Sequence, residues 1–324
     1  MTKDFIIADF RIRIEGANWA SAAGYFGRAL KIFEVPCDPA APCVLVLKTD
    51  AEEERGEIKG EIKGETRGEI KEAATLFGGE FLTLDEFDFV EVNARCRFAR
   101  SDGERLFTMT PEGTSTPLWF RKRCDSPEVR SNLDACCHWP EIHSLFRFGL
   151  WVMFGIAITP LHAIAIHSST IRCEGGAVLF LGESGTGKST HTRLWQEHIP
   201  GAELLNDDSP IIRLTGGEAT VYGSPWSGKT PCYRNEKWPI RGLVRLSQAP
   251  HNRIARLSVV RAIGALLPSC PPSFAFDNTL QDDICETLSQ IISRVPVFHL
   301  ECLPDAAAAE LSYHTLFDDH APQR

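Results

Sequence analysis

The sequence has no excess of positive charge. Its 324 residues include 34 lysines and arginines against 43 aspartates and glutamates, which gives a formal net charge of −9 at pH 7. A chain with this balance repels polyanions and lacks the basic footprint from which nucleic-acid binding begins. We therefore expect no nucleic-acid partner, although the total leaves room for a local basic patch.

Cysteine pairs with the spacing of a zinc ribbon are also absent. The eleven cysteines are scattered from Cys37 to Cys302, and only Cys136 and Cys137 are adjacent, which argues against a zinc ribbon. The first residues, MTKDFIIADF, lack the basic region, long apolar run and small-residue cleavage site of a secretion signal. We expect a cytoplasmic protein with reduced thiols.

Apolar runs of membrane-spanning length are scarce. The segment FGLWVMFGIAITPLHAIAI, residues 148–166, carries no formal charge over nearly the length that a bilayer needs. However, Pro160 pushes the residue before it toward extended geometry, and His162 is polar. We interpret the run as a buried helix that ends near Ile158, followed by a buried strand through Ile166, and we expect no membrane association.

The length and the hydrophobic content predict two domains, because 324 residues exceed the usual size of one domain and 43% hydrophobic residues can build one or two cores. Alternating apolar and polar positions in 5–48 and 88–121 predict a strand-rich first domain, residues 1–140. Within it, a glycine-interrupted charge repeat at 55–72 is typical of a low-complexity insert. Residues 141–324 have the helix and strand texture of an α/β domain.

A glycine-rich segment follows an apolar, β-favouring run in the second predicted domain. The run GGAVLFL, residues 175–181, leads into GESGTGKS, residues 182–189, which fits the phosphate-loop pattern G-x-x-x-x-G-K-[ST]. Glycines let the backbone turn its N–H groups toward phosphate oxygens, and the following helix adds the positive end of its dipole. We expect Lys188 to reach the outer phosphates and Ser189 to contact Mg²⁺. The predicted nucleotide-binding residues are Gly182, Glu183, Ser184, Gly185, Thr186, Gly187, Lys188, Ser189 and Thr190.

Two adjacent aspartates follow the helix after this loop and suggest a reaction. The segment AELLNDDSPIIRL places Asn206, Asp207 and Asp208 at the end of an apolar strand. One carboxylate can serve Mg²⁺ while the other accepts the proton of an attacking hydroxyl. We favour Asp207 as the base and assign Asp208, with Ser189, to the metal. An Asx turn or a helix cap is the structural alternative for the pair.

A histidine upstream completes a resemblance to a known family. His167 ends another apolar strand, with fourteen residues between it and Gly182. Together with the loop and the Asn-Asp-Asp segment, it makes residues 160–250 similar to the catalytic domain of HPr kinase/phosphorylase, a family related in fold to phosphoenolpyruvate carboxykinase. The family's loop reads G-[DE]-S-G-x-G-K-S, and its Ala-Asp-Asp corresponds to Asn-Asp-Asp here. The resemblance implies ATP and Mg²⁺ as cofactors and a catalytic set of His167, Lys188, Asp207 and Asp208, whereas a lone strand histidine is usually structural.

A later family motif, Ile-Glu-Ile-Arg-Gly-Leu-Gly, is similar to WPIRGLVRL at residues 238–246. Pro239 replaces the glutamate of that motif, and no arginine- and glycine-rich loop of the kind that engages phosphoserine occurs near VPVFHLEC, residues 295–302. The resemblance therefore leaves open whether the phosphorylase reaction occurs. The longer form, GESGTGKSTHTRLW with LLNDDSPI and YGSPWSGKTPCYRN, is similar to a bacterial group described as HPr-kinase-like or carboxykinase-like.

A basic segment follows the aspartates. Residues 230–262 reverse the overall charge, with Glu236 as their one acidic residue against seven lysines and arginines. Arginine forks suit carboxylate and phosphate, so we expect Lys229, Arg234 and Arg241 to contact outer phosphates, an acidic peptide or a small phosphorylated acid. A solvated basic face is the alternative for most of these positions.

The carboxy-terminal part offers core periodicity without further chemistry. Its pattern predicts a helix at 282–295, a strand at 295–303 and a last helix at 305–316. We expect its remaining titratable side chains of note to be structural, namely His299, Cys302 and His314.

These patterns predict an α/β protein in which a phosphoenolpyruvate carboxykinase-like P-loop kinase domain follows a smaller, strand-rich α+β domain. The leading function is an ATP- and Mg²⁺-dependent kinase that transfers the γ-phosphoryl group to a hydroxyl acceptor, by resemblance a serine of a protein or peptide. The alternatives are a carboxykinase-like transfer to a small molecule and a regulator that senses ATP without catalysis. The sequence identifies neither the acceptor nor the oligomeric state. It is compatible with a homo-oligomer.

Overall fold

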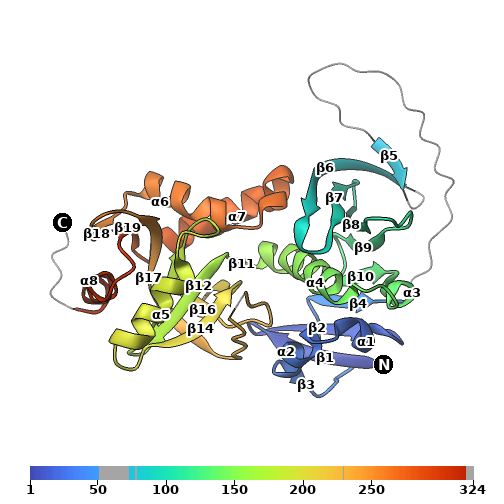
Figure 1. The fold of residues 1–324 in the computed structure, drawn as a ribbon. Coiled ribbons are helices and arrows are strands. Elements are labelled where there is room, and N and C mark those ends of the chain that lie inside the picture. The colour runs from blue at the N-terminus through green and yellow to red at the C-terminus, as the bar shows by residue number, and fades with distance from the viewer. Residues whose placement is uncertain (51–72, 77–78, 229, 319–324) are drawn as a thin grey trace. The chain divides into compact units, whose positions relative to one another are not determined.

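The protein has a mixed α/β architecture with two separate sheets (Figure 1). The structure is a computed structural model, and it describes residues 1–50, 73–76, 79–228 and 230–318. The chain divides into two compact units, Met1–Ala157 and Ile158–Arg324. The predicted insert at 55–72 lies outside the described residues.

The described residues of the first unit form a ten-stranded sheet, as its strand-rich sequence predicts. The sheet order is β3-β1-β2-β4-β10-β9-β8-β7-β6-β5. Neighbouring strands are antiparallel except where β4 meets β2 and β10. The strands are β1 (Thr2–Ile7), β2 (Phe10–Glu15), β3 (Glu34–Val35), β4 (Leu45–Lys48), β5 (Ala73–Leu76), β6 (Gly79–Phe89), β7 (Ala94–Arg100), β8 (Glu104–Pro111), β9 (Leu118–Arg123) and β10 (Glu128–Ser131). The helices are α1 (Trp19–Ala23), α2 (Phe26–Lys31), α3 (Leu133–Cys136) and α4 (Ile142–Ile158), and Val90–Val92 forms a 3-10 turn, η1.

Helix α4 packs within the first unit. Its Phe146 ring meets Phe26 edge to face with ring centroids 6.1 Å apart, and a Cβ on Gly149 would lie 2.2 Å from the Phe120 ring. The division between the units therefore falls after Ala157 and not near residue 140, because the apolar surface of this helix is covered by the first sheet and its helices.

The end of α4 agrees with the sequence. The helix stops at Ile158, just before the Thr159–Leu161 3-10 turn, η2, which contains the proline that removes a backbone donor. The stretch Ile142–Leu161 is long and apolar enough to cross a membrane by length and composition alone. In the structure 61% of its most apolar window is buried, as in the core helix of a folded unit.

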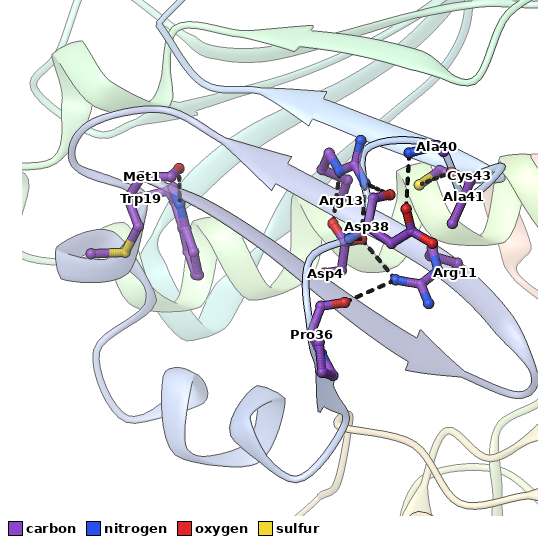
Figure 2. A network of polar contacts seen from close by, with 10 residues as sticks. All are labelled: Met1, Asp4, Arg11, Arg13, Trp19, Pro36, Asp38, Ala40, Ala41 and Cys43. Atoms are coloured by element: carbon purple, nitrogen blue, oxygen red, sulfur yellow. Dashed lines mark hydrogen bonds and ion pairs between the residues drawn. The ribbon is translucent and has the colours of Figure 1, made fainter.

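A buried carboxylate ties the first strands together (Figure 2). Asp4 on β1 has no exposed surface, and its two oxygens accept hydrogen bonds from Arg13 Nε and Nη2 at 2.7 and 2.9 Å. Arg11 Nη1 donates to the same carboxylate at 2.7 Å, and the backbone N–H of Asp38 does so at 3.2 Å. The hydrogen bonds from Arg13 hold the pKa of Asp4 well below its usual range, against the opposing effect of burial. The carboxylate thus joins β1, β2 and the segment after β3.

The second unit contains the predicted α/β elements. Its main strand order is β11-β15-β16-β17-β13-β12-β14, and β19 pairs with β17 on one side and β18 on the other. The strands are β11 (Ala163–Ala165), β12 (Ser168–Cys173), β13 (Gly176–Leu181), β14 (Glu203–Asp208), β15 (Ile211–Thr215), β16 (Glu218–Tyr222), β17 (Lys237–Gln248), β18 (Arg253–Arg256) and β19 (Val297–Cys302). The helices are α5 (Lys188–His198), α6 (Val259–Leu266), α7 (Asn278–Ile292) and α8 (Ala306–Phe317), with 3-10 turns η3 (Leu267–Ser269) and η4 (Pro272–Phe276).

The centre of this sheet is fully buried. Every residue of β13 is buried, which is typical of a strand covered on both faces. Val178 and Phe180 of β13 share one hydrophobic cluster with Leu194 and Trp195 of α5 and with Ala309 of α8, so these two helices cover that face of the sheet. The predicted tail elements are confirmed as α7, β19 and α8, and aspartate side chains cap the first turns of both helices.

Strand directions bring three chain segments to one edge of the sheet. Strand β12 lies between β13 and β14 and is antiparallel to both. Ser168, its first residue, pairs with Leu181 at the end of β13 and with Asp208 at the end of β14. Residues just before β12 and just after β13 and β14 therefore meet at the same edge, and β17 and β19 run parallel to β13 toward it.

Candidate functional site

The segment Gly182–Ser189, here called the glycine loop, connects β13 to α5. Gly182, Gly185 and Gly187 have φ angles of 154°, 84° and 101°, in the region that side chains rarely adopt. A Cβ on Gly182 would also lie 2.5 Å from Thr186 Oγ1. The conformation of the loop therefore depends on these glycines, as the sequence pattern predicts.

The lysine of the glycine loop folds back over it. Lys188 Nζ donates to the carbonyl oxygens of Gly182 at 2.8 Å and Glu183 at 3.3 Å. Partial burial lowers the pKa of Lys188, and the nearby carboxylates of Asp208 and Asp207 act in the opposite direction. The ammonium group thus lies in the field of both aspartates. This position is the one from which a lysine can neutralise a bound phosphate.

Asp207 is the buried member of the pair, with 6% of its surface exposed. Its Oδ1 accepts a hydrogen bond from Ser189 Oγ of the glycine loop at 3.0 Å and one from Ser169 Oγ of β12 at 2.7 Å. Ser169 pairs with Asp207 across the β12–β14 ladder, so the register of these strands sets this contact. One carboxylate oxygen therefore joins β14, β12 and the start of α5.

Asp208 lies beside the upstream histidine. Its Oδ1 is 3.8 Å from His167 Nε2, and the two side chains are 36% and 47% exposed. Partial burial lowers the pKa of His167, Lys188 lowers it further, and Asp208 opposes both. The net shift is downward, so the imidazole is neutral at pH 7. A partly exposed carboxylate beside a neutral imidazole is placed to accept a proton from a bound hydroxyl.

Asn206 holds the end of β14, which carries Asp208. Its side chain is completely buried, and its Oδ1 accepts from the backbone N–H groups of Asp208 at 3.0 Å and Ser209 at 2.9 Å. Its Nδ2 donates to the carbonyl oxygen of Trp226 at 3.0 Å. An amide satisfies both roles because it has a donor and an acceptor on one planar group. Asn206 thus fixes the end of β14.

The oxygens of Ser189 and Asp207 fit a magnesium ion. Mg²⁺ prefers oxygen ligands at about 2.1 Å in octahedral geometry, which places neighbouring ligands about 3.0 Å apart. The Ser189 Oγ to Asp207 Oδ1 distance is 3.0 Å. Within the described ranges, no group of three or more His, Cys, Asp or Glu side chains gathers to hold a metal. A divalent ion at this site would take its remaining ligands from phosphate and water.

Two of the basic residues that we expect to contact phosphate or carboxylate groups do not lie at the glycine loop. Arg241 follows Ile240, which pairs with Ala177 at the start of β13, so it lies at the end of that strand opposite the loop. Arg234 Nη2 pairs with Glu203 at 2.9 Å, at the start of β14, and its Nη1 with Glu236 at 3.4 Å. The guanidinium of Arg234 is thus paired with two carboxylates, and it lies far from the strand ends that carry the site. Lys229 lies outside the described residues.

Other side chains that contact the glycine loop were not predicted as part of the site. Arg245, which ends the β13–β17 register opposite Leu181, donates from Nη2 to Glu183 Oε1 at 2.8 Å. Gln248 Nε2 donates to the carbonyl oxygen of Gly185 at 3.3 Å. Ser169 was missed as well, although the run Ser168-Ser169-Thr170 at the start of an apolar strand is the signal that could have found it. The remaining loop residues Glu183 and Ser184 are exposed.

Comparisons with known proteins do not assign the chain to a family. No protein-family model matches the sequence, and no curated protein matches it.

Proposed function

We propose that the second unit is an ATP- and Mg²⁺-dependent phosphotransferase of the phosphoenolpyruvate carboxykinase-like P-loop type, acting on a hydroxyl acceptor, with a serine of a protein or peptide as the leading candidate. The observation that carries the proposal is the convergence at one sheet edge of the glycine loop, the Asp207–Asp208 pair and His167. Each member of the set supplies a different requirement of phosphoryl transfer. These requirements are phosphate binding, charge neutralisation and removal of a proton.

The glycine loop is proposed to hold the triphosphate. Its turned backbone presents N–H groups, and α5 begins at Lys188 with its N-terminal dipole directed at the loop. Lys188 Nζ, which now donates to two loop carbonyls, is free to exchange those neutral acceptors for phosphate oxygens. A charged acceptor makes the stronger hydrogen bond.

The geometry supports an exchange of the two aspartate roles that the sequence suggested. Ser189 shares a hydrogen bond with Asp207, not with Asp208, so these two residues would hold Mg²⁺. When bound, the ion would neutralise charge on the outer phosphate oxygens. Asp208 is more exposed and lies beside the neutral imidazole of His167. We therefore assign Asp208 as the general base.

The transfer balances with these residues alone. The carboxylate of Asp208 takes the proton of the acceptor hydroxyl while the acceptor oxygen bonds to the γ-phosphorus. The bond from the γ-phosphorus to the bridging oxygen breaks, and ADP leaves with the electron pair. His167 can then accept the proton from Asp208 and release it to solvent, because its imidazole is neutral near pH 7.

The test is label transfer from γ-labelled ATP, with Mg²⁺ and host lysate, by the wild type and the variants Asp207→Asn and Asp208→Asn. For Asp208→Asn we expect transfer to fall at least about 100-fold with Mg·ATP affinity retained, because a general base contributes about 10² to 10⁴ in rate. For Asp207→Asn we expect the Mg²⁺ concentration for half-maximal transfer to rise at least about tenfold. Asp282→Asn, at an exposed position of α7, is the matched control.

Three outcomes decide the proposal. Full transfer by both aspartate variants would exclude this mechanism. A wild type that binds Mg·ATP tightly but labels nothing would instead support an ATP-sensing regulator. ATP consumption that depends on oxaloacetate and forms phosphoenolpyruvate would reveal a carboxykinase-type reaction.

A further inference from the structure

The basic segment at residues 230–262 contains arginines that the candidate site does not use. Glu236 is followed by no further aspartate or glutamate until Asp277. Two arginines of the segment, Arg234 and Arg245, pair with glutamates. No ion pair with any described residue is formed by three others, all exposed, which are Arg253, Arg256 and Arg261. Positive charge without a partner therefore gathers on a chain whose net charge is −9.

Two of these arginines lie on β18, an outer strand of the second sheet (Figure 1). Among the described strands, β18 pairs with β19 alone. The N–H of Leu257 donates to the carbonyl oxygen of Val297 at 2.8 Å, which continues the β18–β19 register. Because backbone groups point alternately to the two sides of a strand, those of Ile254 and Arg256 point away from β19. The free side of β18 therefore offers donors and acceptors to an added strand.

The third arginine lies in the first turn of α6, beside two exposed valines. Val259 and Val260 are 62% and 81% exposed. The first turn contains no acidic side chain, and Ser258 makes no side-chain hydrogen bond to cap it. The positive end of the helix dipole disfavours a cation such as Arg261 and favours a carboxylate. These side chains do not stabilise α6, but they suit an acidic partner that also carries apolar groups.

Strand β18 begins at the edge of the sheet that carries the candidate site. Its first residue, Arg253, lies opposite Glu301 near the end of β19. The carboxylate of Glu301 lies 3.9 Å from His251 and forms no ion pair with Arg253. Five strand spacings of about 4.8 Å separate β18 from β14, a distance of about 24 Å. A polypeptide that leaves β18 at this edge needs about seven extended residues to reach Asp208.

We propose that β18 and the first turn of α6 bind an extended, acidic segment of a protein partner, which adds a strand to the sheet at β18. Main-chain hydrogen bonds to Ile254 and Arg256 hold the segment, and its carboxylates meet the three guanidinium groups. Its apolar side chains cover Val259 and Val260. The partner is the hydroxyl acceptor, an identification that rests on the proposed function. The serine that is modified then lies outside the bound segment.

The first experiment measures peptide binding to the full chain by fluorescence anisotropy, without nucleotide. The probe is a fluorescein-labelled octapeptide in which glutamate and threonine alternate. One comparison peptide has lysine at every glutamate, and the other carries a methyl group on every backbone nitrogen. We expect the acidic peptide to bind at least about tenfold more tightly than either, because lysine reverses the charge and methylation removes the main-chain donors. Equal affinity of the lysine peptide would overturn the acidic partner, and equal affinity of the methylated peptide would overturn strand addition.

The second experiment reverses one charge on β18. We expect Arg256→Glu to weaken the acidic peptide at least about tenfold, a difference of about 1.4 kcal/mol. Arg28→Glu, at an exposed arginine of α2, makes the same change of net charge and should stay within about twofold of the wild type. Wild-type affinity in Arg256→Glu would overturn the proposal. Self-association of the wild type that Arg256→Glu abolishes would assign this edge to a second copy of the chain and also overturn it.

Hydrogen exchange of the wild-type protein needs no variant and locates the bound peptide. We expect saturating acidic peptide to slow exchange at least about tenfold in fragments that contain residues 253–261. Protection confined to other segments would overturn the proposal, whatever Arg256→Glu does to folding.

The label-transfer assay separates this proposal from the proposed function. In limiting lysate, we expect Arg256→Glu to lower labelling of the protein acceptor at least about tenfold, with Mg·ATP affinity unchanged. Undiminished labelling by this variant would overturn docking of the acceptor and leave the phosphotransferase intact. Peptide binding by a wild type that transfers no label would instead refute the proposed function and leave the binding surface.

Discussion

Protonation of His191 should loosen the packing of α8 on α5. The imidazole is buried, with 3% of its surface exposed, and its Nε2 lies 3.2 Å from Ser312 Oγ of α8. Ser312 Oγ also accepts from Trp195 Nε1 at 2.9 Å, so one hydroxyl joins the two helices. Burial lowers the pKa of His191 from 6.5 to about 4. Between pH 6.5 and about 4, the imidazole of His191 is therefore protonated in the unfolded chain and neutral in the folded unit.

The sign and the size follow from this shift. Above pH 6.5 the imidazole is neutral in both the folded and the unfolded state, so burial of His191 costs the folded state no free energy of deprotonation. As the pH falls from 6.5 toward about 4, the unfolded state gains a proton that the folded state does not bind, and stability is lost. Each pH unit within this window costs about 1.4 kcal/mol, so a change from pH 7 to pH 5 costs about 2 kcal/mol. That change is about thirtyfold in the opening equilibrium.

Hydrogen exchange measured by mass spectrometry on peptides from α5 and α8 is the assay, with rates corrected for the intrinsic effect of pH. His191→Gln is the comparison, because glutamine keeps a donor for Ser312 and cannot titrate. Between pH 7 and pH 5, we expect the opening free energy of the variant to fall by about 2 kcal/mol less than that of the wild type. This difference does not depend on the absolute stability of the variant. Equal pH responses of wild type and variant in α5 and α8 would refute the reasoning. His251→Gln, at a half-exposed histidine, should leave the response unchanged.

Two further substitutions test the contacts that position the strands. Asn206→Ala leaves the N–H groups of Asp208 and Ser209 without their acceptor, so we expect a loss of about 1–3 kcal/mol in unfolding free energy and slower label transfer with Mg·ATP affinity retained. Transfer within about twofold of the exposed control Asn235→Ala would contradict this role. Asp4→Asn leaves the buried guanidinium of Arg13 and the partly exposed guanidinium of Arg11 without their carboxylate and should destabilise the first unit by about 3–5 kcal/mol, measured by exchange of β1 and β2. A loss below about 1 kcal/mol, as we expect for exposed Asp125→Asn, would show that the arginines find other partners.

The sequence correctly predicts those parts of the site that are set by residues close together in the chain. The glycines have positive φ angles, the apolar run before them is β13, and the aspartate pair ends β14. These features depend on residues close in the chain. His167 also meets Asp208, since both lie where apolar strands begin or end.

The sequence fails where the direction of a strand decides the outcome. Arg241 and Arg245 lie on the same strand, but residues of a strand advance by about 3.3 Å each, so about 13 Å separates them. Because β17 runs parallel to β13, Arg245 reaches the glycine loop and Arg241 lies at the far end. No local pattern distinguishes them, and the basic run singled out Arg241, which does not lie at the glycine loop. The same reason hides the free side of β18, because no local pattern shows which strand lies at the edge of a sheet.

The antiparallel position of β12 between β13 and β14 limits how this site can diversify. Ser169 approaches Asp207 from β12, whose first residue is paired on both sides, and His167, just before that strand, approaches Asp208. Deleting one residue within that strand would turn Ser169 to the opposite face and displace His167 in the same event. Evolutionary changes at this end of β12 can therefore exchange side chains, while changes of length are confined to the distant Glu174–Gly175 hairpin.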